Sequence, residues 1–512
     1  MRLQTGALTM RPLGICLGSF RQAYKNLFGL KWLRFPEANL SPRIGGRSTF
    51  VCPGFSERVP AASLMMEYVL QLLRRDVTRG VAGTILLKVG SGGLAFAMFS
   101  LAARTMSADA FGLFATWLCI AQIASVIGLV GQELVLVRFL NEYQALGAND
   151  LAKGVLRFCM GVAAAATVAA AAVIAVAGGV KGEEALLVLA VVAFMVVNSG
   201  LMLGSQIARA LVSILMGEGN REFFWRIVVV TFLLVSLLGH QQISPAEMFL
   251  LMAAAMLIGL AVQAVSIARA LPAVHETTAR YETRRWTASG GRFWLSSILE
   301  GANQYFDVIL IYWLLDGVTA GIYFAASRLA NIFAMLSAAL YTFAARRLPL
   351  LYFSKNHQEF EHTIVLMAEV TALCVLSGLV VVCVGAPYLL GLFGPAFVGQ
   401  KWTLIVLALG TAFQAAGGPA AAIIQLTGRE SSYVPVVAAN VLLRLVGFFV
   451  LIPWLGVLGA AVAATLSLGV TTIALNVICR RWTGVDPSVL VLFTRSRWKA
   501  RVRPAAAADP NG

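Results

Sequence analysis

Long apolar runs alternate with short polar segments along most of the chain. Each run approaches the roughly 20 residues with which an α-helix crosses about 30 Å of hydrocarbon. The pattern predicts about twelve transmembrane helices, at 81–103, 111–132, 156–178, 185–210, 223–240, 246–269, 292–315, 318–345, 363–386, 402–426, 433–454 and 457–479. No connection between them is long enough to form a catalytic domain outside the membrane.

The composition indicates the same class of protein. Hydrophobic residues make up 59% of the 512 residues and charged residues 12%, and the mean hydropathy is +0.81. Soluble domains average about 45–50% apolar and 25% charged residues. In water this chain would expose too much apolar surface, whereas a bilayer covers it. We therefore expect an all-α polytopic membrane protein.

The 40 Lys and Arg residues are distributed unevenly about the predicted helices. Of these, 34 fall in the two terminal segments and in alternate connections, whereas only Arg104, Lys181 and Lys401 fall in the opposite connections. The positive-inside rule places the basic side in the cytoplasm, so both termini are predicted to be cytoplasmic. This topology accounts for the net charge of +16 without nucleic acid as a partner.

The longest strongly basic connection divides the predicted helices into two groups of six. We expect an N-terminal lobe at 65–270, a cytoplasmic linker at 271–291, a C-terminal lobe at 292–480 and a basic cytoplasmic tail at 481–512. Residues 1–64 are basic and lack the apolar run of a signal peptide. Two interpretations stay open for them: a poorly ordered cytoplasmic extension, or a segment ahead of a true start at Met65 or Met66.

A weak internal repeat accompanies this division. The segment 111–115 (FGLFA) resembles 320–324 (AGIYF) at an offset of 209 residues, and Gln122 corresponds to Asn331 at the same offset. Transporters are often built from such repeats. Six helices in each half would start both halves on the same side of the membrane, which indicates parallel repeats.

A polar stripe follows one face of the seventh predicted helix. Glu300 and Asp307 are seven residues apart and therefore share a face, with Asn303 and Gln304 between them. Ionisable groups at bilayer depth cost about 2.5–3.5 kcal/mol on insertion scales and are functional candidates. The stripe either lines a water-filled cavity or makes interhelical hydrogen bonds alone. Glu300 and Asp307 are the candidates for ion coupling or gating.

Deep basic residues occur on three other predicted helices. Arg328 has Asn331 one turn later, and Arg444 has Asn440 one turn earlier. Both arginines lie too deep for easy snorkelling, so each either pairs with a carboxylate of the polar stripe or binds an anionic ligand. Lys88 lies closer to the cytoplasmic end of its helix, where snorkelling is a strong alternative.

Sequence signals of an enzyme are missing. The four His and seven Cys form no metal-ligand spacing and no CxxC pair, and no phosphate-binding GxxxxGK[ST] loop occurs. We expect no catalytic residue, no metal and no cofactor other than a coupling ion. The Gly417-Gly418-Pro419 break inside a predicted helix is typical either of a cavity wall or of a packing kink.

Four segments resemble polysaccharide flippases of the multidrug/oligosaccharidyl-lipid/polysaccharide exporter superfamily. Residues 451–464 (LIPWLGVLGAAVAA) resemble that family's l-x-P-x-x-G-x-x-G-A-A-x-A motif, and 389–397 (LLGLFGPAF) its L-x-L-F-G-x-x-F turn. The stretch from Asp307 to Tyr323 resembles the start of its second half, although Ile311-Tyr312 replaces the usual Leu-Gly. Residues 72–75 (LLRR), with 102–104 (AAR) and 111–112 (FG), resemble its opening.

The resemblance implies a two-lobed fold similar to that of the multidrug and toxic compound extrusion (MATE) transporters. The implied activity is alternating-access transport of an undecaprenyl-pyrophosphate oligosaccharide across the bacterial inner membrane, for lipopolysaccharide O-antigen, capsule or exopolysaccharide. The implied partners are this lipid-linked oligosaccharide, membrane lipids, and polysaccharide polymerase or export machinery. Na⁺ or H⁺ is the implied coupling ion.

The deep polar residues fit such a substrate. Arginines would meet the diphosphate and amides the sugar hydroxyls. The expected substrate-binding set is Arg328, Arg444, Lys88, Asn331, Asn440, Asn303, Gln304 and Gln122. The alternative function is a MATE-type drug/cation antiporter, for which an acidic and aromatic cavity is expected instead.

Overall fold

The computed structural model describes the helical part of the chain, namely residues 76–213, 215–270, 277–335, 337–338, 348, 357–426, 430–484 and 486–493. The chain divides into two compact units, 1–68 and 69–512. The first unit, and with it both interpretations of residues 1–64, lies outside the described residues. All regular structure in the described part of the second unit is helical.

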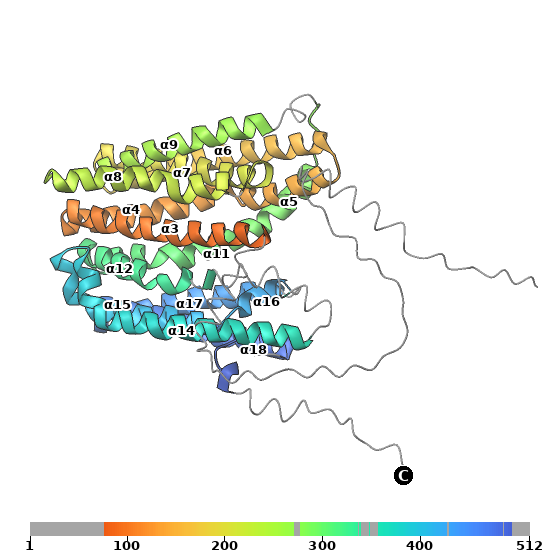
Figure 1. The fold of residues 1–512 in the computed structure, drawn as a ribbon. Coiled ribbons are helices and arrows are strands. Elements are labelled where there is room, and N and C mark those ends of the chain that lie inside the picture. Colours follow the sequence, from red (N-terminus) through yellow and green to blue (C-terminus); the bar gives the residue numbers. More distant parts are fainter. Residues whose placement is uncertain are drawn as a thin grey trace, which may run out of the picture. The chain divides into compact units, whose positions relative to one another are not determined.

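The helices form two groups that follow each other in the sequence. In the first group, α3 and α4 lie beside the second group, and most of the remaining helices pack on their far side (Figure 1). Its bounds are α3 Asp76–Thr105, α4 Ala108–Leu129, α5 Gln132–Ala145, α6 Asn149–Val180, α7 Ala185–Leu211, the π-helix η1 Leu215–Phe224, α8 Trp225–Leu238 and α9 Pro245–Ala270.

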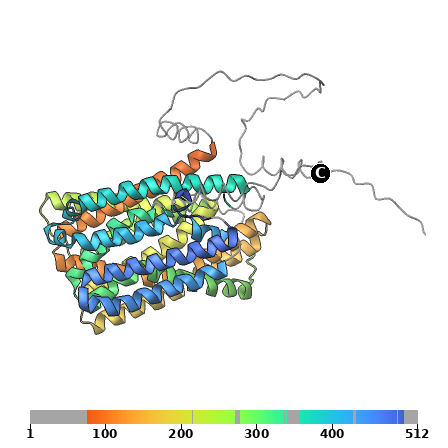
Figure 2. The same cartoon turned by 90° about the horizontal axis from the view of Figure 1, so that it is seen from below.

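The second group runs from green to blue in Figures 1 and 2. Its bounds are α11 Thr283–Leu314, α12 Gly317–Ala330, α14 His357–Gly391, the 3₁₀ helix η2 Pro395–Gln400, α15 Lys401–Ala416, α16 Ala420–Leu426, α17 Glu430–Leu455 and α18 Val457–Thr483. Nine helices of the described chain are long and apolar enough to cross a membrane. The all-α polytopic class is confirmed, and the count of about twelve stays a prediction.

Helix α5 was not expected from the sequence. The apolar run of α4 ends at Leu129, and the chain then turns through two residues with left-handed backbone, Val130 (φ 50°) and Gly131 (φ 68°). A left-handed pair ends one helix and redirects the next. The amphipathic α5 therefore lies in a region predicted to be a connection. Its polar residues interrupt any apolar run, so the hydrophobic pattern did not predict it.

Three other boundaries differ from expectation. The predicted helix 402–426 is interrupted at Gly417-Gly418-Pro419, which separates α15 from α16. The predicted helix 223–240 is preceded by the π-helix η1, a rare form that tends to occur at functional positions. Helix α11 begins at Thr283, inside the range predicted as the cytoplasmic linker.

The internal repeat extends to the ends of the helices. Ser107 is the N-cap of α4 and accepts a hydrogen bond from Ala110 N. Asp316, which is 209 residues later, is the N-cap of α12 and accepts one from Thr319 N, also 209 residues after Ala110. Such side chains satisfy the free N–H groups of a helix start. The start of this helix therefore recurs at the same offset in both halves.

The repeat-related segments also contact each other. Helices α4 and α12 pack together, and a Cβ built on Gly112 would overlap the carbonyl oxygen of Gly317. A Cβ on Gly321, the repeat counterpart of Gly112, would lie 3.0 Å from Gly112 Cα. Two equivalent positions meet only where they face each other across the relating axis. The axis that relates the halves therefore passes between α4 and α12.

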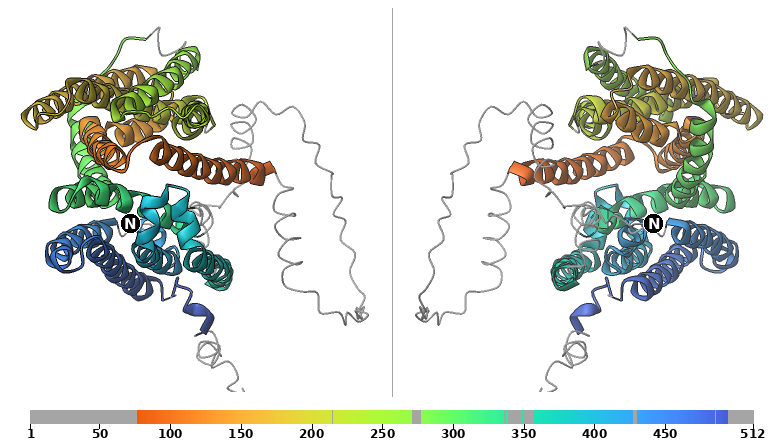
Figure 3. Two further views of the ribbon diagram at one scale, coloured as in Figure 1. Left: turned by 90° about the vertical axis from the view of Figure 1, so that its left-hand side faces the viewer. Right: turned by 90° about the vertical axis from the view of Figure 1, so that its right-hand side faces the viewer.

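The buried apolar clusters differ between the two ends of the helical assembly. We call the end with Arg104, Lys181 and Lys401 the charge-poor end, and the opposite end the basic end. One buried apolar cluster reaches the charge-poor end and combines residues of both groups, from Met98 to Ala464. At the basic end the described residues form two separate clusters, one around Phe139 and Trp286 and one within the second group. Figure 3 shows the molecule from both ends.

Candidate functional site

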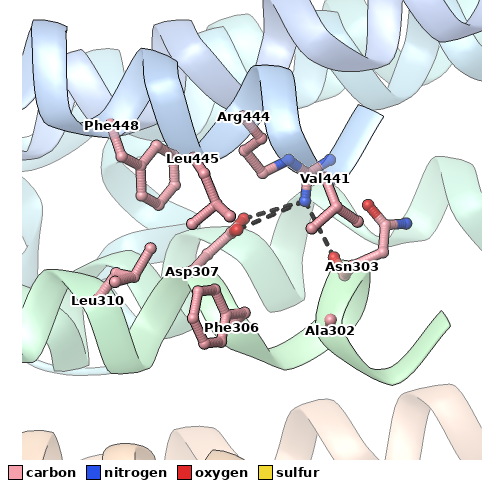
Figure 4. Close-up of a pocket in the computed structure, with 9 residues that line it drawn as sticks. All are labelled: Ala302, Asn303, Phe306, Asp307, Leu310, Val441, Arg444, Leu445 and Phe448. Atoms are coloured by element: carbon pink, nitrogen blue, oxygen red, sulfur yellow. Dashed lines mark hydrogen bonds and ion pairs between the residues drawn. The ribbon is translucent and has the colours of Figure 1, made fainter. Parts of the chain in front are cut away.

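A buried ion pair joins α11 to α17. Arg444 Nη1 lies 3.2 Å from Asp307 Oδ2 and 3.5 Å from Asp307 Oδ1 (Figure 4). The same Nη1 donates to Asn303 O at 2.9 Å, and Arg444 Nε donates to Ser467 Oγ at 3.1 Å. Tyr323 OH donates to Asp307 Oδ2 at 2.9 Å. Both charges are thus paired and hydrogen-bonded.

The helical period explains why these residues meet. Asn303 and Asp307 are four residues apart on α11, and Asn440 and Arg444 are four apart on α17, so each pair presents one polar stripe. The stripes face each other, because Asn440 Nδ2 also donates to Asn303 Oδ1 at 2.8 Å. Asn440 Oδ1 is buried and has no hydrogen-bond partner among the described residues.

A narrow pocket lies at this junction. Its lining is Ala302, Asn303, Phe306, Asp307, Leu310, Val441, Arg444, Leu445 and Phe448. It has room for about one water molecule. The junction therefore holds charges and ordered donors but is too small for a saccharide as it stands.

The polar stripe predicted on the seventh helix divides into two. Asn303 and Asp307 point to α17, as described, whereas Glu300 and Gln304 are exposed and make no hydrogen bond or ion pair with any described residue. Asn303 and Asp307 thus make interhelical contacts, and the water-filled cavity stays a prediction.

Arg328 has an environment unlike that of Arg444. Its guanidinium carbon lies 4.6 Å from the ring centroid of Phe324, 5.6 Å from that of Phe99 and 5.7 Å from that of Tyr305. Its Nε is buried without a hydrogen-bond partner, and no carboxylate of the described chain pairs with it. The rings come from α12, α3 and α11, so this cation lies where both groups of helices meet.

The first group has buried neutral polar side chains that hydrogen-bond to each other. Asn198 Nδ2 donates to Gln122 Oε1 at 3.2 Å and to Ser125 Oγ at 3.1 Å. Gln263 Nε2 donates to Ser205 Oγ at 2.9 Å. Of these residues the sequence analysis selected only Gln122. Asn198 was detectable as an amide inside a long apolar run.

The remaining predicted site residues lie apart from the ion pair. Asn331 is the C-cap of α12, and its backbone N–H donates to Ser327 O. Lys88 belongs to α3, and its side chain lies outside the described residues. The structure therefore joins Asn303, Asp307, Asn440 and Arg444, and places Arg328, Gln122, Glu300, Gln304 and Asn331 in other surroundings.

Comparison with known proteins finds one matching family and a shared fold. The family model described as "Polysaccharide biosynthesis protein" matches residues 77–345, more than half of the chain. Among curated proteins, none matches this sequence.

Solved structures show the same fold at low identity. An inward-facing multidrug resistance MATE family transporter of the MOP superfamily is 13% identical, with a TM-score of 0.58, covering 78% of this chain and 94% of that one. An outward-facing multidrug resistance MATE family transporter of the MOP superfamily is 15% identical, with a TM-score of 0.55, covering 81% of this chain and 97% of that one. A mutant of the Vibrio cholerae MATE transporter VcmN is 13% identical, with a TM-score of 0.53, covering 79% and 98%.

Proposed function

The chain belongs to the polysaccharide biosynthesis protein family, and from this premise we propose that it carries a lipid-linked oligosaccharide across the bacterial inner membrane. The substrate class is an undecaprenyl-pyrophosphate saccharide, destined for surface or secreted polysaccharide. The MATE-like fold supports a transporter that exposes its site to each side in turn. The excess of basic residues at one end supports cytoplasmic termini.

The observation that carries the proposal is the unpaired Arg328. A cation at bilayer depth is costly unless a counter-charge meets it. Three aromatic rings contribute part of that compensation, of order 2 kcal/mol in a desolvated site. A diphosphate would supply the rest, because an arginine fork binds phosphate oxygens through charge-assisted hydrogen bonds. We therefore assign the head-group contact to Arg328.

Arg444 has a different role in this proposal. Asp307 already neutralises it, so a diphosphate would have to compete with a buried carboxylate. The pair is better suited to gating or to ion coupling, since protonation of Asp307 or binding of Na⁺ near it would release Arg444. Glu300, which is exposed on α11, is the second candidate for the coupling ion.

A drug/cation antiporter fits the same fold less well. An organic cation would approach the aromatic rings that the Arg328 guanidinium already occupies. Like charges in a site of low dielectric repel each other strongly. The charge of Arg328 is therefore of the wrong sign for a cationic substrate at these rings.

The test measures binding of an undecaprenyl-pyrophosphate oligosaccharide to the purified protein in lipid nanodiscs. Arg328→Ala should weaken binding at least tenfold, because a hydrogen bond to a charged group contributes about 1.5–3 kcal/mol. Arg328→Lys keeps the charge but loses the fork, so it should weaken binding less. Arg157→Ala, an exposed arginine on α6, is the matched control. Unchanged binding by Arg328→Ala would refute the assignment, and tighter binding of organic cations by wild type would favour the antiporter.

A further inference from the structure

Two polar side chains of α3 reach the end of α14 at the charge-poor end. Arg104 Nε donates to Leu392 O at 2.8 Å, and Arg104 Nη2 donates to Gly391 O at 3.1 Å. Ser100 Oγ donates to Leu392 O at 2.7 Å. These contacts join residues almost 300 positions apart in the sequence, and they connect the first group of helices to the second.

The acceptors are suited to a basic partner. Gly391 is the last residue of α14 and Leu392 directly follows it, and the carbonyls at a helix C-terminus have no partner within the helix. They also carry the negative end of the helix dipole, which favours a nearby cation. The guanidinium fork of Arg104 binds two of these carbonyls together, which an ammonium group could not do with the same geometry.

A second basic residue makes a similar connection. Lys181, between α6 and α7, places its Nζ 4.3 Å from the ring centroid of Trp313 and 5.7 Å from that of Tyr312, near the end of α11. By contrast, Lys401 lies over the ring of its own neighbour Trp402, at 5.7 Å. Two of the three basic residues at this end therefore link the groups.

Apolar contacts close the same end. Phe96 and Phe393 pack edge to face with centroids 5.6 Å apart, and Phe111 and Phe397 do so at 5.7 Å. Each pair has one ring from each group of helices, and all belong to or pack against the shared core. At the basic end α11 also contacts the first group, since Trp286 packs in the cluster around Phe139 and Arg285 pairs with Glu142, whereas the third cluster lies within the second group alone.

We propose that Arg104 and Ser100 form a releasable clamp on the C-terminal carbonyls of α14, which holds the charge-poor end shut in this structure. Release of the clamp opens that end. The clamp is releasable because Arg104 is exposed, so water competes for its donors once the groups separate. The link to a transport cycle rests on the proposed function, whereas the closure itself does not.

Access to Cys119 tests the clamp without measuring transport. This thiol is fully buried on α4, which packs against α11 and α12. In a variant where Cys119 is the only cysteine, a membrane-impermeant maleimide is added from the charge-poor side. Arg104→Ala should raise the labelling rate about threefold to tenfold, the range expected for weak charged hydrogen bonds at a surface. Lys401→Ala removes the same charge at the same end and should leave the rate unchanged.

A distance measurement covers the case in which the single-cysteine protein folds poorly. Spin labels at Asp109→Cys on α4 and Ala396→Cys on η2 report the separation of the groups at this end. Arg104→Ala should add or enlarge a population with longer distances, and Arg104→Lys should do so less. Identical labelling rates and distances in Arg104→Ala and wild type would overturn the clamp, and so would equal effects of Lys401→Ala. Loss of oligosaccharide binding alone would affect only the proposed function.

Discussion

The two halves of this protein share a helical skeleton but differ in what they bury. Helices α3 and α11 end 209 residues apart, at Thr105 and Leu314, and α4 and α12 begin at the same offset. The first half buries the neutral network around Asn198, whereas the second buries the charged pair of Asp307 and Arg444. The two halves therefore share their backbone architecture but not the chemistry of these buried side chains.

This difference between the halves separates positions that the fold requires from positions that can vary. Caps and close glycine contacts recur because both halves must begin the same helix and pack it against its counterpart. The position that corresponds to Asp307 by the offset is Met98, a buried core residue. The same place in the skeleton thus accepts either a hydrophobic side chain or an ionised one with its partners.

The largest expected effect comes from breaking the charged pair in the second half. Arg444→Ala leaves a buried carboxylate without its counter-charge, which costs about 3–5 kcal/mol in the free energy of unfolding. Denaturant unfolding of the purified protein in detergent measures the change. Arg444→Ala combined with Asp307→Asn should recover most of the loss, because the unpaired charge is removed. A loss below about 1 kcal/mol in Arg444→Ala would contradict a buried, mutually dependent pair.

A smaller loss is expected where the halves touch. Gly112→Ala would force a methyl group against the backbone of Gly317, and overpacking costs about 1–3 kcal/mol. Gly161→Ala is the control, because a Cβ at that position of α6 meets nothing within 4 Å. It should be neutral or stabilising by up to about 1 kcal/mol. Thermal unfolding should separate the two variants, and equal stabilities would show that α4 and α12 pack less closely than described.

The neutral network of the first half should contribute less than the ion pair. Asn198→Ala removes the donor to Gln122 and Ser125 and should cost about 0.6 kcal/mol, with roughly 1.7 kcal/mol as the upper end for hydrogen bonds between membrane helices. Unfolding of the variant in the same detergent gives the comparison. A loss as large as that of Arg444→Ala would remove the contrast between the halves.

The smallest effect is expected at the exposed contact between α5 and the start of α11. Arg285 Nη2 lies 2.7 Å from Glu142 Oε1, and about half of the Arg285 side chain is exposed. Exposed pairs contribute about 0–1 kcal/mol. Arg285→Ala should therefore shift the unfolding midpoint little, and any shift should shrink as salt is added. A salt-independent loss would indicate a structural role beyond charge.

The sequence predicted the fold better than the site. Apolar runs located most of the helices, because the bilayer imposes one length and one composition on each. Helix α5 was not predicted, because it follows a left-handed turn at Val130 and its amphipathic sequence contains no long apolar run. The pairing of Arg444 with Asp307, and not with Glu300, depends on how α11 and α17 are rotated about their axes. The rings around Arg328 come from three helices, and no local pattern in the sequence brings them together.

The contact of Gly112 with Gly317 and Gly321 has a consequence for how such a chain can vary. A dimer of identical subunits that met through this contact would obey a two-fold axis, so every substitution would appear twice, at mirrored distances from it. An acidic side chain introduced in one subunit would also be present in the other, and each of the two would need a basic partner. A single chain with a linked pair of halves is free of this doubling. It can place one carboxylate and one guanidinium on one side of the axis and leave a hydrophobic side chain at the corresponding place on the other.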